Sequence, residues 1–287
     1  MQAIPVRHIK SSIKEPDTSE EFIIWSLSDL LSGKDMVQEL HRHSFYFILI
    51  IENGTGDHII DFTPCPVNSQ SVHIMRPGQV HELKLQSDCK GYLLQFTDEF
   101  CLNYDTETKQ ILKKISRKDY YLSESDTFEK IVFFMKTIFQ EASRKEFKHR
   151  YAIRTNLQLF FVELYRQGYS SVDIPDEETS YRLERLEVFR ELIAEHNSNH
   201  KQVRWYAGKM NLTVYQLNSI TKTILGKSSS EIINDYILLE AKRYLLATTN
   251  QINQISWYLG YEDVSYFIRF FKKHMGYSPE AFRSHFK

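Results

Sequence analysis

The chain has few cysteines and no long apolar run, and both absences argue against whole classes of protein. Its 287 residues contain three cysteines, Cys65, Cys89 and Cys101, an odd set without a CxxC spacing. Such a set indicates neither a disulfide framework nor a thiolate zinc site, so we expect reduced thiols. The longest apolar run, Phe45 to Ile51, has the length of a strand. A helix that crosses a membrane needs roughly 20 apolar residues, so we expect no membrane partner.

The first residues also lack the apolar core of a signal peptide. Pro5, Arg7, His8 and Lys10 stand where that core would lie, so we expect a cytoplasmic protein. Hydrophobic residues make up 42% and charged residues 25% of the chain, as in ordinary soluble globular proteins. A length of 287 residues favours two domains over one.

Strong net charge of either sign is absent as well, but the total conceals an asymmetry. From residue 201 onward there are 12 Lys and Arg against 6 Asp and Glu, whereas residues 1–200 hold 24 against 31. A basic part joined to an acidic part is typical of a protein in which one part binds nucleic acid. Chance clustering on solvated surfaces gives the same counts, so this feature alone does not decide.

Between about residue 20 and about residue 100, apolar and polar residues alternate with a period of two. Turn residues separate short runs that have the length of strands, at 45–51, 58–62, 64–68, 72–75 and 92–96. Short strands at regular spacing predict a small β-barrel or a sandwich.

From about residue 126 the apolar period becomes helical. Two apolar stripes follow, Phe128, Ile131, Val132, Met135, Ile138 and Phe139, then Ile153, Leu157, Phe160, Phe161 and Leu164. They predict an antiparallel pair of helices over about 126–167, joined at 144–146 and ended by Gly168. The stripes fit either a core against the barrel or a subunit interface, and the sequence leaves both open.

Residues 169–182 are polar, with Pro175 and an acidic run at 176–178, and we expect an interdomain linker there. The next apolar periodicity predicts a helix from Leu183 to His196, which opens a second domain over 183–287.

The second domain repeats one pattern. Apolar and glycine positions between Val203 and Ile232 recur between Ile252 and Phe282, with an offset that grows by one residue at the turn. Each copy has the order helix, tight turn, helix, so the repeat predicts a tandem helix-turn-helix domain. The amphipathic segment 229–247 joins the copies as a rigid helix. That spacing matters, because both units must meet successive major grooves about 34 Å apart.

Turn and cap residues fix where each recognition helix begins. We expect Asn211 and Gly260 in the turns, Thr213 capping the first recognition helix, and Glu262 or Asp263 capping the second. The candidate DNA-binding residues are Tyr215, Gln216, Asn218, Ser219 and Lys222 in the first unit, and Val264, Ser265, Ile268, Arg269, Lys272 and Lys273 in the second. Arg269 is the best candidate for a guanine contact, because its planar fork matches two acceptors of that base. Any one of these residues alone fits a solvated surface position equally well.

The stretch from Ile252 to Arg283, with the connector from Glu240 to Leu246, closely resembles the C-terminal signature of the AraC/XylS family of bacterial transcription regulators. The resemblance covers about the last hundred residues and implies a seven-helix domain with two DNA-binding units. Carried over by position, the base-contacting places fall on Tyr215, Asn218, Ser219, Val264, Ser265, Ile268 and Arg269. This chain departs from the family where an Arg is common at Ser219 and a Phe at Thr221. It also lacks an Arg near Tyr236 or Ile237. We therefore expect weaker or less selective binding by the first unit.

The N-terminal half resembles the cupin-type sensor domain found in many members of this family. The segments 41–47, 53–56 and 77–81 carry that resemblance. In metal-binding cupins an HxH pair, a carboxylate and a later histidine converge, and here Phe47 stands at the carboxylate position. His41, His43 and His81 remain, a set able to hold zinc or iron. In regulators of this family the histidines usually frame the pocket without metal, so we expect no metal and no cofactor.

Barrel mouths lined by aromatic residues and a few polar groups commonly bind small molecules. The candidate effector contacts are His41, His43, Phe45, Tyr46, Phe47 and His81.

Together these observations predict an α+β protein with a cupin-like barrel and helical pair over 1–168 and an all-α tandem helix-turn-helix domain over 183–287. The resemblance implies a transcription regulator, not an enzyme, that binds promoter DNA and a small-molecule effector. The family also implies activation through RNA polymerase, and we expect a homodimer formed through the helical pair. The alternatives are a metal-dependent cupin enzyme with an accessory helical domain, and a constitutive DNA-binding regulator whose barrel only dimerises.

Overall fold

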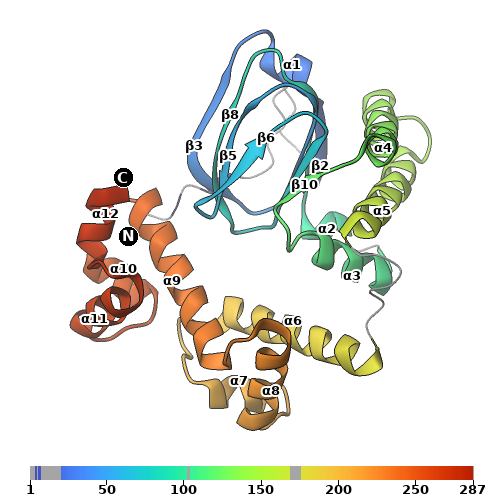
Figure 1. Cartoon of the computed structure of the whole chain (residues 1–287). Helices are drawn as coiled ribbons and strands as arrows, with labels where there is room; N and C mark the ends of the chain where they lie inside the picture. Colours follow the sequence, from blue (N-terminus) through green and yellow to red (C-terminus); the bar gives the residue numbers. More distant parts are fainter. Residues whose placement is uncertain (1–3, 5, 8–20, 102–103, 169–175, 287) are drawn as a thin grey trace. The chain divides into compact units, whose positions relative to one another are not determined.

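The computed structural model describes residues 4, 6–7, 21–101, 104–168 and 176–286. The chain divides into two compact units, one of Pro5–Asp173 and one that contains Ile174–Lys287 (Figure 1). Among the helices in the described part, none is long and apolar enough to cross a membrane. Each unit is described below by itself.

Two five-stranded sheets form the centre of the N-terminal unit. The strands are β1 (Val6–Arg7), β2 (Phe22–Ser26), β3 (Met36–His43), β4 (Tyr46–Asn53), β5 (Gly56–Ile60), β6 (Thr63–Val67), β7 (Ser71–Met75), β8 (Val80–Leu85), β9 (Lys90–Phe96) and β10 (Tyr120–Leu122). One sheet has the order β1-β3-β8-β5-β6 and the other β10-β7-β4-β9-β2. Neighbouring strands are antiparallel, except that β1 and β3 are parallel. The predicted all-β core of this unit is confirmed.

Strand β4 is buried on both faces, which explains its unbroken apolar sequence. Phe47, Leu49 and Ile51 pack between the two sheets, together with residues of β5, β6 and β8. Ile48 and Ile50 alternate with them and pack on the opposite face against helices. Because successive side chains of a strand point to opposite faces, one strand supplies both cores.

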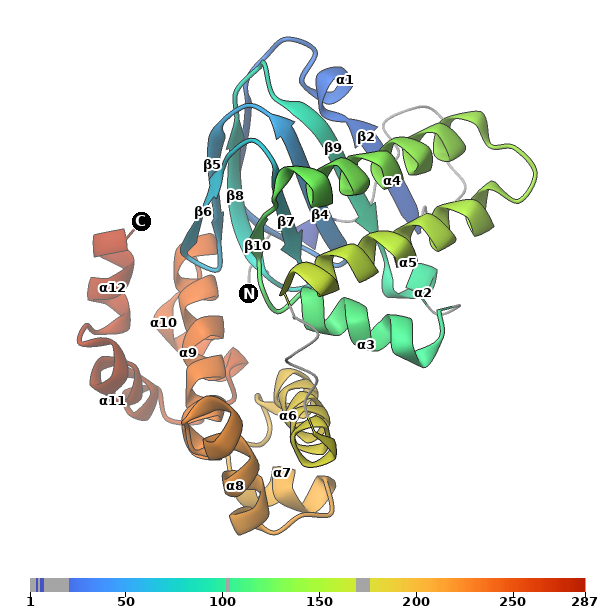
Figure 2. The same ribbon diagram turned by 45° about the vertical axis from the view of Figure 1, so that its right-hand side comes forward.

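Helices cover the outer face of the β4 sheet (Figure 2). They are α2 (Asp98–Cys101), α3 (Thr106–Ile115), α4 (Ser125–Arg144) and α5 (His149–Gly168). Helix α1 (Leu27–Leu31) instead packs on the core between the sheets through Leu27 and Leu31. The predicted helical pair is confirmed as α4 and α5. Phe128, Ile131, Met135 and Ile138 of α4 are buried against Leu157 and other apolar residues of α5 and against the sheet, so these stripe positions are core.

Several elements have no counterpart in the sequence-based description. Helix α3 was not predicted, although Asp105 caps it by accepting from the Thr108 backbone N–H at 2.7 Å. Strands β2, β3, β8 and β10 were also missing from the predicted runs. In β3 the only buried residues are His41 and His43, which follow five half-buried or exposed residues, so the apolar alternation that marks a strand is weak there.

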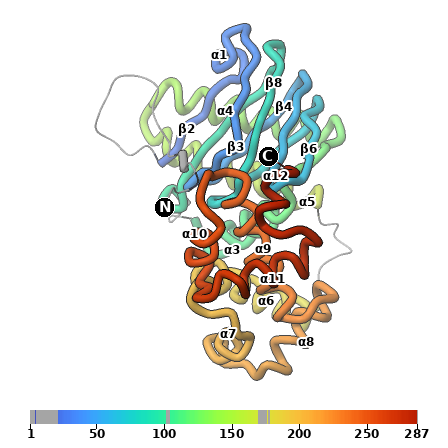
Figure 3. The backbone as a smooth tube through the Cα atoms, turned by 90° about the vertical axis from the view of Figure 1, so that its left-hand side faces the viewer, coloured from blue at the N-terminus to red at the C-terminus, as the bar shows by residue number. Residues whose placement is uncertain are grey.

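The second unit is entirely helical in its described part (Figure 3). Its helices are α6 (Glu177–His196), α7 (Val203–Lys209), α8 (Val214–Leu225), α9 (Ser229–Ala247), α10 (Ile252–Tyr258), α11 (Val264–Met275) and α12 (Pro279–Phe286). Helix α6 begins at Glu177, earlier than the predicted Leu183, because Asp176 caps it through the Thr179 backbone N–H at 2.8 Å. The end of the predicted linker is thus helical, and residues 169–175 lie outside the described residues.

Candidate functional site

The first recognition helix, α8, begins where the sequence predicts. Asn211 has a φ of 54° in the turn after α7, and asparagine tolerates this left-handed conformation better than most residues. Thr213 then caps α8 in a reciprocal capping box with Gln216. Gly226, with a φ of 69°, ends the helix. The turn and both caps therefore fix which residues α8 exposes at its start.

The second recognition helix, α11, is fixed by a tighter turn. Gly260 has a φ of 75°, and a Cβ at this position would lie 1.6 Å from the carbonyl oxygen of Ser198. Only glycine fits both the backbone conformation and the space. Asp263, one of the two predicted caps, accepts from the Ser265 backbone N–H at 2.7 Å. Helix α11 ends at Gly276.

In the first helix-turn-helix unit, four of the candidate DNA-binding residues divide into two groups. Tyr215 is 84% exposed and Lys222 is also exposed, so both are accessible to DNA. The side chain of Asn218 instead accepts a hydrogen bond from the Ser229 backbone N–H at 2.9 Å, at the start of α9. The Gln216 side chain accepts from the Thr213 backbone N–H at 2.8 Å. Adenine recognition uses both the oxygen and the nitrogen of an amide, and here each oxygen is already engaged.

In the second helix-turn-helix unit the corresponding side chains contribute less to capping the helices. Ser265, Arg269, Lys272 and Lys273 are exposed, and Val264 and Ile268 are half-buried. Arg269 lies 3.9 Å from Asp263 with both side chains mostly exposed, a weak surface ion pair that DNA phosphate or a base edge would replace at little cost. Two basic side chains close to the recognition surface fit phosphate contacts.

A lysine that sequence reasoning missed links the two halves of this domain. The Lys201 ammonium donates to the carbonyl oxygens of Asn197, Ser198 and Gly260 at 3.3, 3.2 and 2.9 Å. It also lies 4.6 Å from the ring centre of Tyr261. Burial lowers the pKa of Lys201. Gly260 belongs to the turn of the second helix-turn-helix unit, and Asn197 follows α6. The Lys201 side chain therefore fixes the second helix-turn-helix unit against the first.

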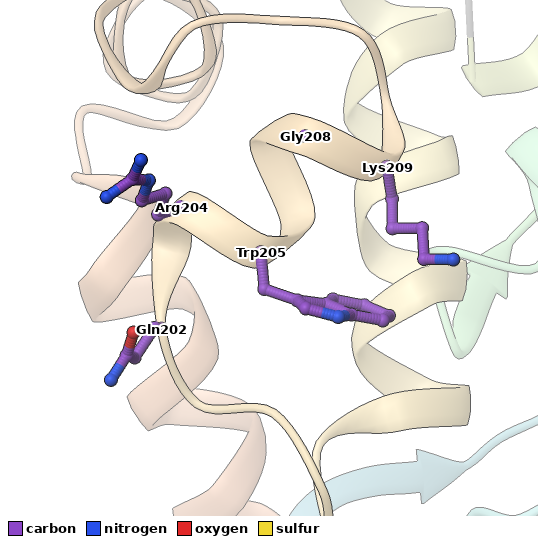
Figure 4. Close-up of a pocket in the computed structure, with 5 residues that line it drawn as sticks. All are labelled: Gln202, Arg204, Trp205, Gly208 and Lys209. Atoms are coloured by element: carbon purple, nitrogen blue, oxygen red, sulfur yellow. The ribbon is translucent and has the colours of Figure 1, made fainter.

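A shallow hollow lies on helix α7, lined by Gln202, Arg204, Trp205, Gly208 and Lys209. Figure 4 shows Trp205 and Lys209 extending to one side of the helix and Arg204 and Gln202 to the other. The Lys209 ammonium lies 5.4 Å from the ring centre of Trp205. The sequence repeat did not predict a binding site at these residues.

Five buried histidines gather between the two sheets of the N-terminal unit. His41 and His81 are direct partners in the pairing of β3 with β8, and His43 follows on the same face of β3. The Nε2 atom of His81 lies 3.1 Å from Nε2 of His41 and 2.8 Å from Nε2 of His43. The predicted convergence of these three histidines is therefore present in the fold.

His58 on β5 and His73 on β7 extend this cluster, and sequence reasoning missed both. His58 Nε2 lies 2.8 Å from His81 Nδ1, and His58 Nδ1 lies 3.1 Å from His73 Nδ1. Burial lowers the pKa of His73 to about 4 and, with the neighbouring histidines, lowers that of His58 as well. A signal existed, because His58 shares a strand face with Ile60 and His73 with Met75, both inward-facing.

Of the predicted effector contacts, the aromatic residues do not all reach this cluster. The Phe47 ring is parallel to that of His43 with centres 5.4 Å apart, and Phe45 lies 4.4 Å from His43. Tyr46 does not join them. Its ring stacks on Phe96 at 5.1 Å and packs on the helix-covered face of β4, because it is out of phase with Phe47 along the strand.

Comparison with known proteins identifies both units. Residues 206–285 match a family model described as "Helix-turn-helix domain", and residues 33–123 match one described as "AraC-like ligand binding domain". The chain therefore contains a helix-turn-helix domain and a domain similar to the ligand-binding domain of AraC.

Several transcription regulators match this chain over most of its length. It is 23% identical over 257 residues to the uncharacterized HTH-type transcriptional regulator YfiF of Bacillus subtilis, covering 86% of this chain and 79% of YfiF. It is 21% identical over 249 residues to the HTH-type transcriptional activator RhaS of Escherichia fergusonii, covering 85% of this chain and 86% of RhaS. The crystal structure of ToxT from Vibrio cholerae O395 matches with a TM-score of 0.41 and 16% identity, over 92% of this chain and 98% of that one.

The two domain matches and the sequence relatives bear out the predicted resemblance to the AraC family, the fold class and a DNA-binding transcription regulator with a ligand-binding domain. The chain thus has two candidate sites, one in the N-terminal unit and one in the helical unit. The candidate DNA site is the set of exposed residues on α8 and α11, and the candidate ligand site is the set of buried histidines with their aromatic neighbours.

Proposed function

We propose that this protein regulates transcription by sequence-specific binding to promoter DNA, under the control of a small-molecule effector held between the two sheets of its N-terminal unit. The observation that carries this proposal is the pair of recognition helices, α8 and α11. Each begins after a tight turn with a side-chain cap. One continuous helix, α9, lies between them in the chain and fixes their spacing.

In the second helix-turn-helix unit we assign base contacts to Val264, Ser265, Ile268 and Arg269. Ser265 and Arg269 are exposed, and Val264 and Ile268 are half-buried. Residues on the outer side at the start of a recognition helix reach base edges in the major groove. Lys272 and Lys273 lie farther along α11 and fit phosphate contacts, which hold the helix in register.

In the first helix-turn-helix unit we keep Tyr215 and Ser219 as base contacts and Lys222 as a phosphate contact. Gln216 and Asn218 act mainly as caps, as their hydrogen bonds indicate. With two amide side chains committed to the fold, this unit contributes less to sequence selection than the second.

The effector, in this proposal, binds among His41, His43, Phe45, Phe47 and His81. All five side chains are buried between the sheets, and imidazoles with aromatic rings offer both polar and apolar contacts. Control requires that the effector bind the DNA-competent and DNA-incompetent states with different affinity. A domain that dimerises without sensing a ligand would show equal DNA affinity with every metabolite tested.

We further propose that the protein acts in the cytoplasm as a homodimer that contacts RNA polymerase. Three aromatic side chains on and between α4 and α5 are well exposed, namely Phe133, Phe147 and Tyr151. Exposed aromatic clusters commonly mark protein interfaces. RhaS, to which the chain is similar, is a transcriptional activator, and this supports activation.

The protein is not an enzyme in this proposal, although the convergence of three histidines favours a second candidate, a metal-dependent cupin enzyme. The two are separated by one experiment on the purified full-length chain. Fluorescence anisotropy should show salt-dependent binding to a selected duplex that Arg269→Ala weakens. Metal-dependent turnover that His41 or His81 replacement abolishes, without specific DNA binding, would favour the enzyme.

A further inference from the structure

The hydrogen-bond partners of the histidine cluster fix where its protons lie. At one end, His41 Nδ1 lies 2.6 Å from the carbonyl oxygen of Glu39. A carbonyl oxygen only accepts, so His41 Nδ1 carries the hydrogen. A neutral imidazole has a single ring hydrogen, and Nε2 of His41 therefore presents a lone pair.

The other end of the cluster gives the same result for His81. The Ser71 hydroxyl donates its one hydrogen to the carbonyl oxygen of Asn68 at 2.5 Å, and its oxygen accepts from His73 Nε2 at 3.4 Å. His73 Nδ1 then accepts from His58 Nδ1 at 3.1 Å. His58 Nε2 accepts in turn from His81 Nδ1 at 2.8 Å, which leaves a lone pair on Nε2 of His81.

Two lone pairs thus face each other across 3.1 Å, on His41 and His81, with Nε2 of His43 at 2.8 Å from His81. A neutral His43 has one hydrogen, and on Nε2 that hydrogen satisfies the lone pair of His81 while the lone pair of His41 still faces it. A metal ion in place of that hydrogen accepts a lone pair from each of the three nitrogens.

The spacing of the three nitrogens fits one ion. A metal–nitrogen bond of about 2.0–2.1 Å places two ligand nitrogens about 3.0 Å apart at a right angle and about 3.3 Å apart in a tetrahedron. The ligand atoms of His41, His43 and His81 all lie within 4.8 Å of one another. In the described part of the chain this is the only group of histidine, cysteine or carboxylate ligands with such spacing.

We propose that His41, His43 and His81 bind one divalent first-row transition-metal ion through Nε2, and that His58 and His73 orient His81. Three imidazoles suit zinc, iron, nickel or copper and disfavour magnesium and calcium. The second-layer hydrogen bond from His81 to His58 fixes both tautomer and ring orientation. This inference departs from the expectation of no metal, and it concerns the N-terminal unit alone, so it does not depend on DNA binding.

The experiment uses full-length protein without a histidine tag, stripped of metal with a chelator. Titration with Co²⁺ should give visible ligand-field bands that saturate at one ion per chain, without the sulfur-to-metal charge transfer that a thiolate ligand produces. Zn²⁺ should displace the cobalt. With one equivalent of Cu²⁺, pulsed electron paramagnetic resonance should detect remote nitrogens of coordinated imidazole.

Three variants test the assignment of ligands and of the second layer. His81→Gln and His43→Phe should each weaken Zn²⁺ binding at least about 100-fold, because three ligands become two. His58→Gln keeps all three ligands and should weaken it about 10- to 100-fold. The matched control is His149→Gln, on α5 and outside the cluster, which should bind Zn²⁺ like the wild type. Thermal unfolding followed by near-ultraviolet circular dichroism shows whether each variant is folded.

Failure of the folded wild-type chain to bind Co²⁺, Zn²⁺, Fe²⁺ or Cu²⁺ at one per chain would overturn the proposal, even where every variant misfolds. Stoichiometric binding that is unchanged in folded His81→Gln and His43→Phe would overturn it too. Specific DNA binding by the same preparation would be unaffected by either result, so a failure here is distinguishable from a failure of the proposed function.

Discussion

At the scale of single residues, each recognition helix divides its polar side chains between folding and recognition. Asn218 and Gln216 form hydrogen bonds that cap helices, whereas Tyr215 and Arg269 are exposed and have few internal contacts. Residue type alone does not separate these roles, since an exposed amide is equally able to cap a helix or pair with adenine. The roles predict different consequences of substitution.

Arg269→Ala and Lys272→Ala should weaken DNA binding in different ways. Loss of an arginine that contacts one base should cost about 1–3 kcal/mol on the preferred duplex and relax selection at a single position. Loss of a phosphate contact should weaken all duplexes alike and reduce the salt slope by about one. Titrations of the selected duplex and its single-base variants at several salt concentrations measure both. Equal losses on every duplex for Arg269→Ala would refute the base contact.

Asn218→Ala should lower stability more than it alters sequence preference. It removes the acceptor of the Ser229 backbone N–H, and loss of such a cap costs about 1 kcal/mol. Thermal unfolding should show the loss, while the ranking of duplexes in a binding competition stays the same. A changed base preference at unchanged stability would return Asn218 to the base-contacting set.

Stability of the metal-free N-terminal unit should fall as pH falls from about 6.5 to about 4. Burial lowers the pKa of His73 from its ordinary value of 6.5 to about 4, so the unfolded chain binds more protons in this interval and is favoured. The groups that face it are His58 and Tyr120. The shift corresponds to about 3 kcal/mol at most.

Urea unfolding with chelator present, followed by fluorescence at several pH values, measures this loss. His73→Gln should show a shallower pH dependence because one titrating group is removed. Stability that does not change, or that rises, on acidification between pH 6.5 and 4 would contradict a buried neutral His73.

At the scale of elements, the turn at Gly260 and the Lys201 side chain hold the second helix-turn-helix unit against the first. Gly260→Ala should destabilise the domain by at least about 2 kcal/mol, because it combines left-handed strain with a clash against the Ser198 carbonyl. Binding to a duplex with both elements should fall together with stability.

Gly208→Ala is the matched control, since a Cβ there meets nothing within 4 Å and Gly208 lies inside α7. It should leave stability unchanged or raise it by up to about 1 kcal/mol. Thermal unfolding of both variants compares the two sites. An equal, small effect at both positions would show that the Gly260 turn is not restricted to glycine.

The elements best predicted from the sequence are those whose signals are local. The bounds of α9 and the caps Thr213 and Asp263 follow from residues within a few positions, and such signals need no knowledge of distant partners. His58 and His73 were missed because strand pairing across the unit brings them to His81. The capping role of Asn218 depends on Ser229 in the next helix, and Tyr46 was misplaced because the face each residue occupies depends on strand phase.

At the scale of the whole molecule, the account joins a ligand-binding unit to a DNA-binding unit in one chain. The charge asymmetry along the sequence agrees with this division, since basic residues exceed acidic ones only in the part from residue 201 onward. The two sites are separate in chemistry, one buried and rich in imidazole, the other exposed and basic. Coupling between them requires that ligand binding change the population of DNA-competent chains.

The most direct test of the central claim is selection of bound duplexes from a random library by the full-length protein at near-physiological salt. The account predicts an enriched motif with two short elements about one helical turn apart, about 34 Å along the duplex. Arg269→Ala should lose selection at one position of one element only. Enrichment of a single element, or none with the metal-loaded protein over a panel of candidate effectors, would contradict two recognition helices acting on one DNA site.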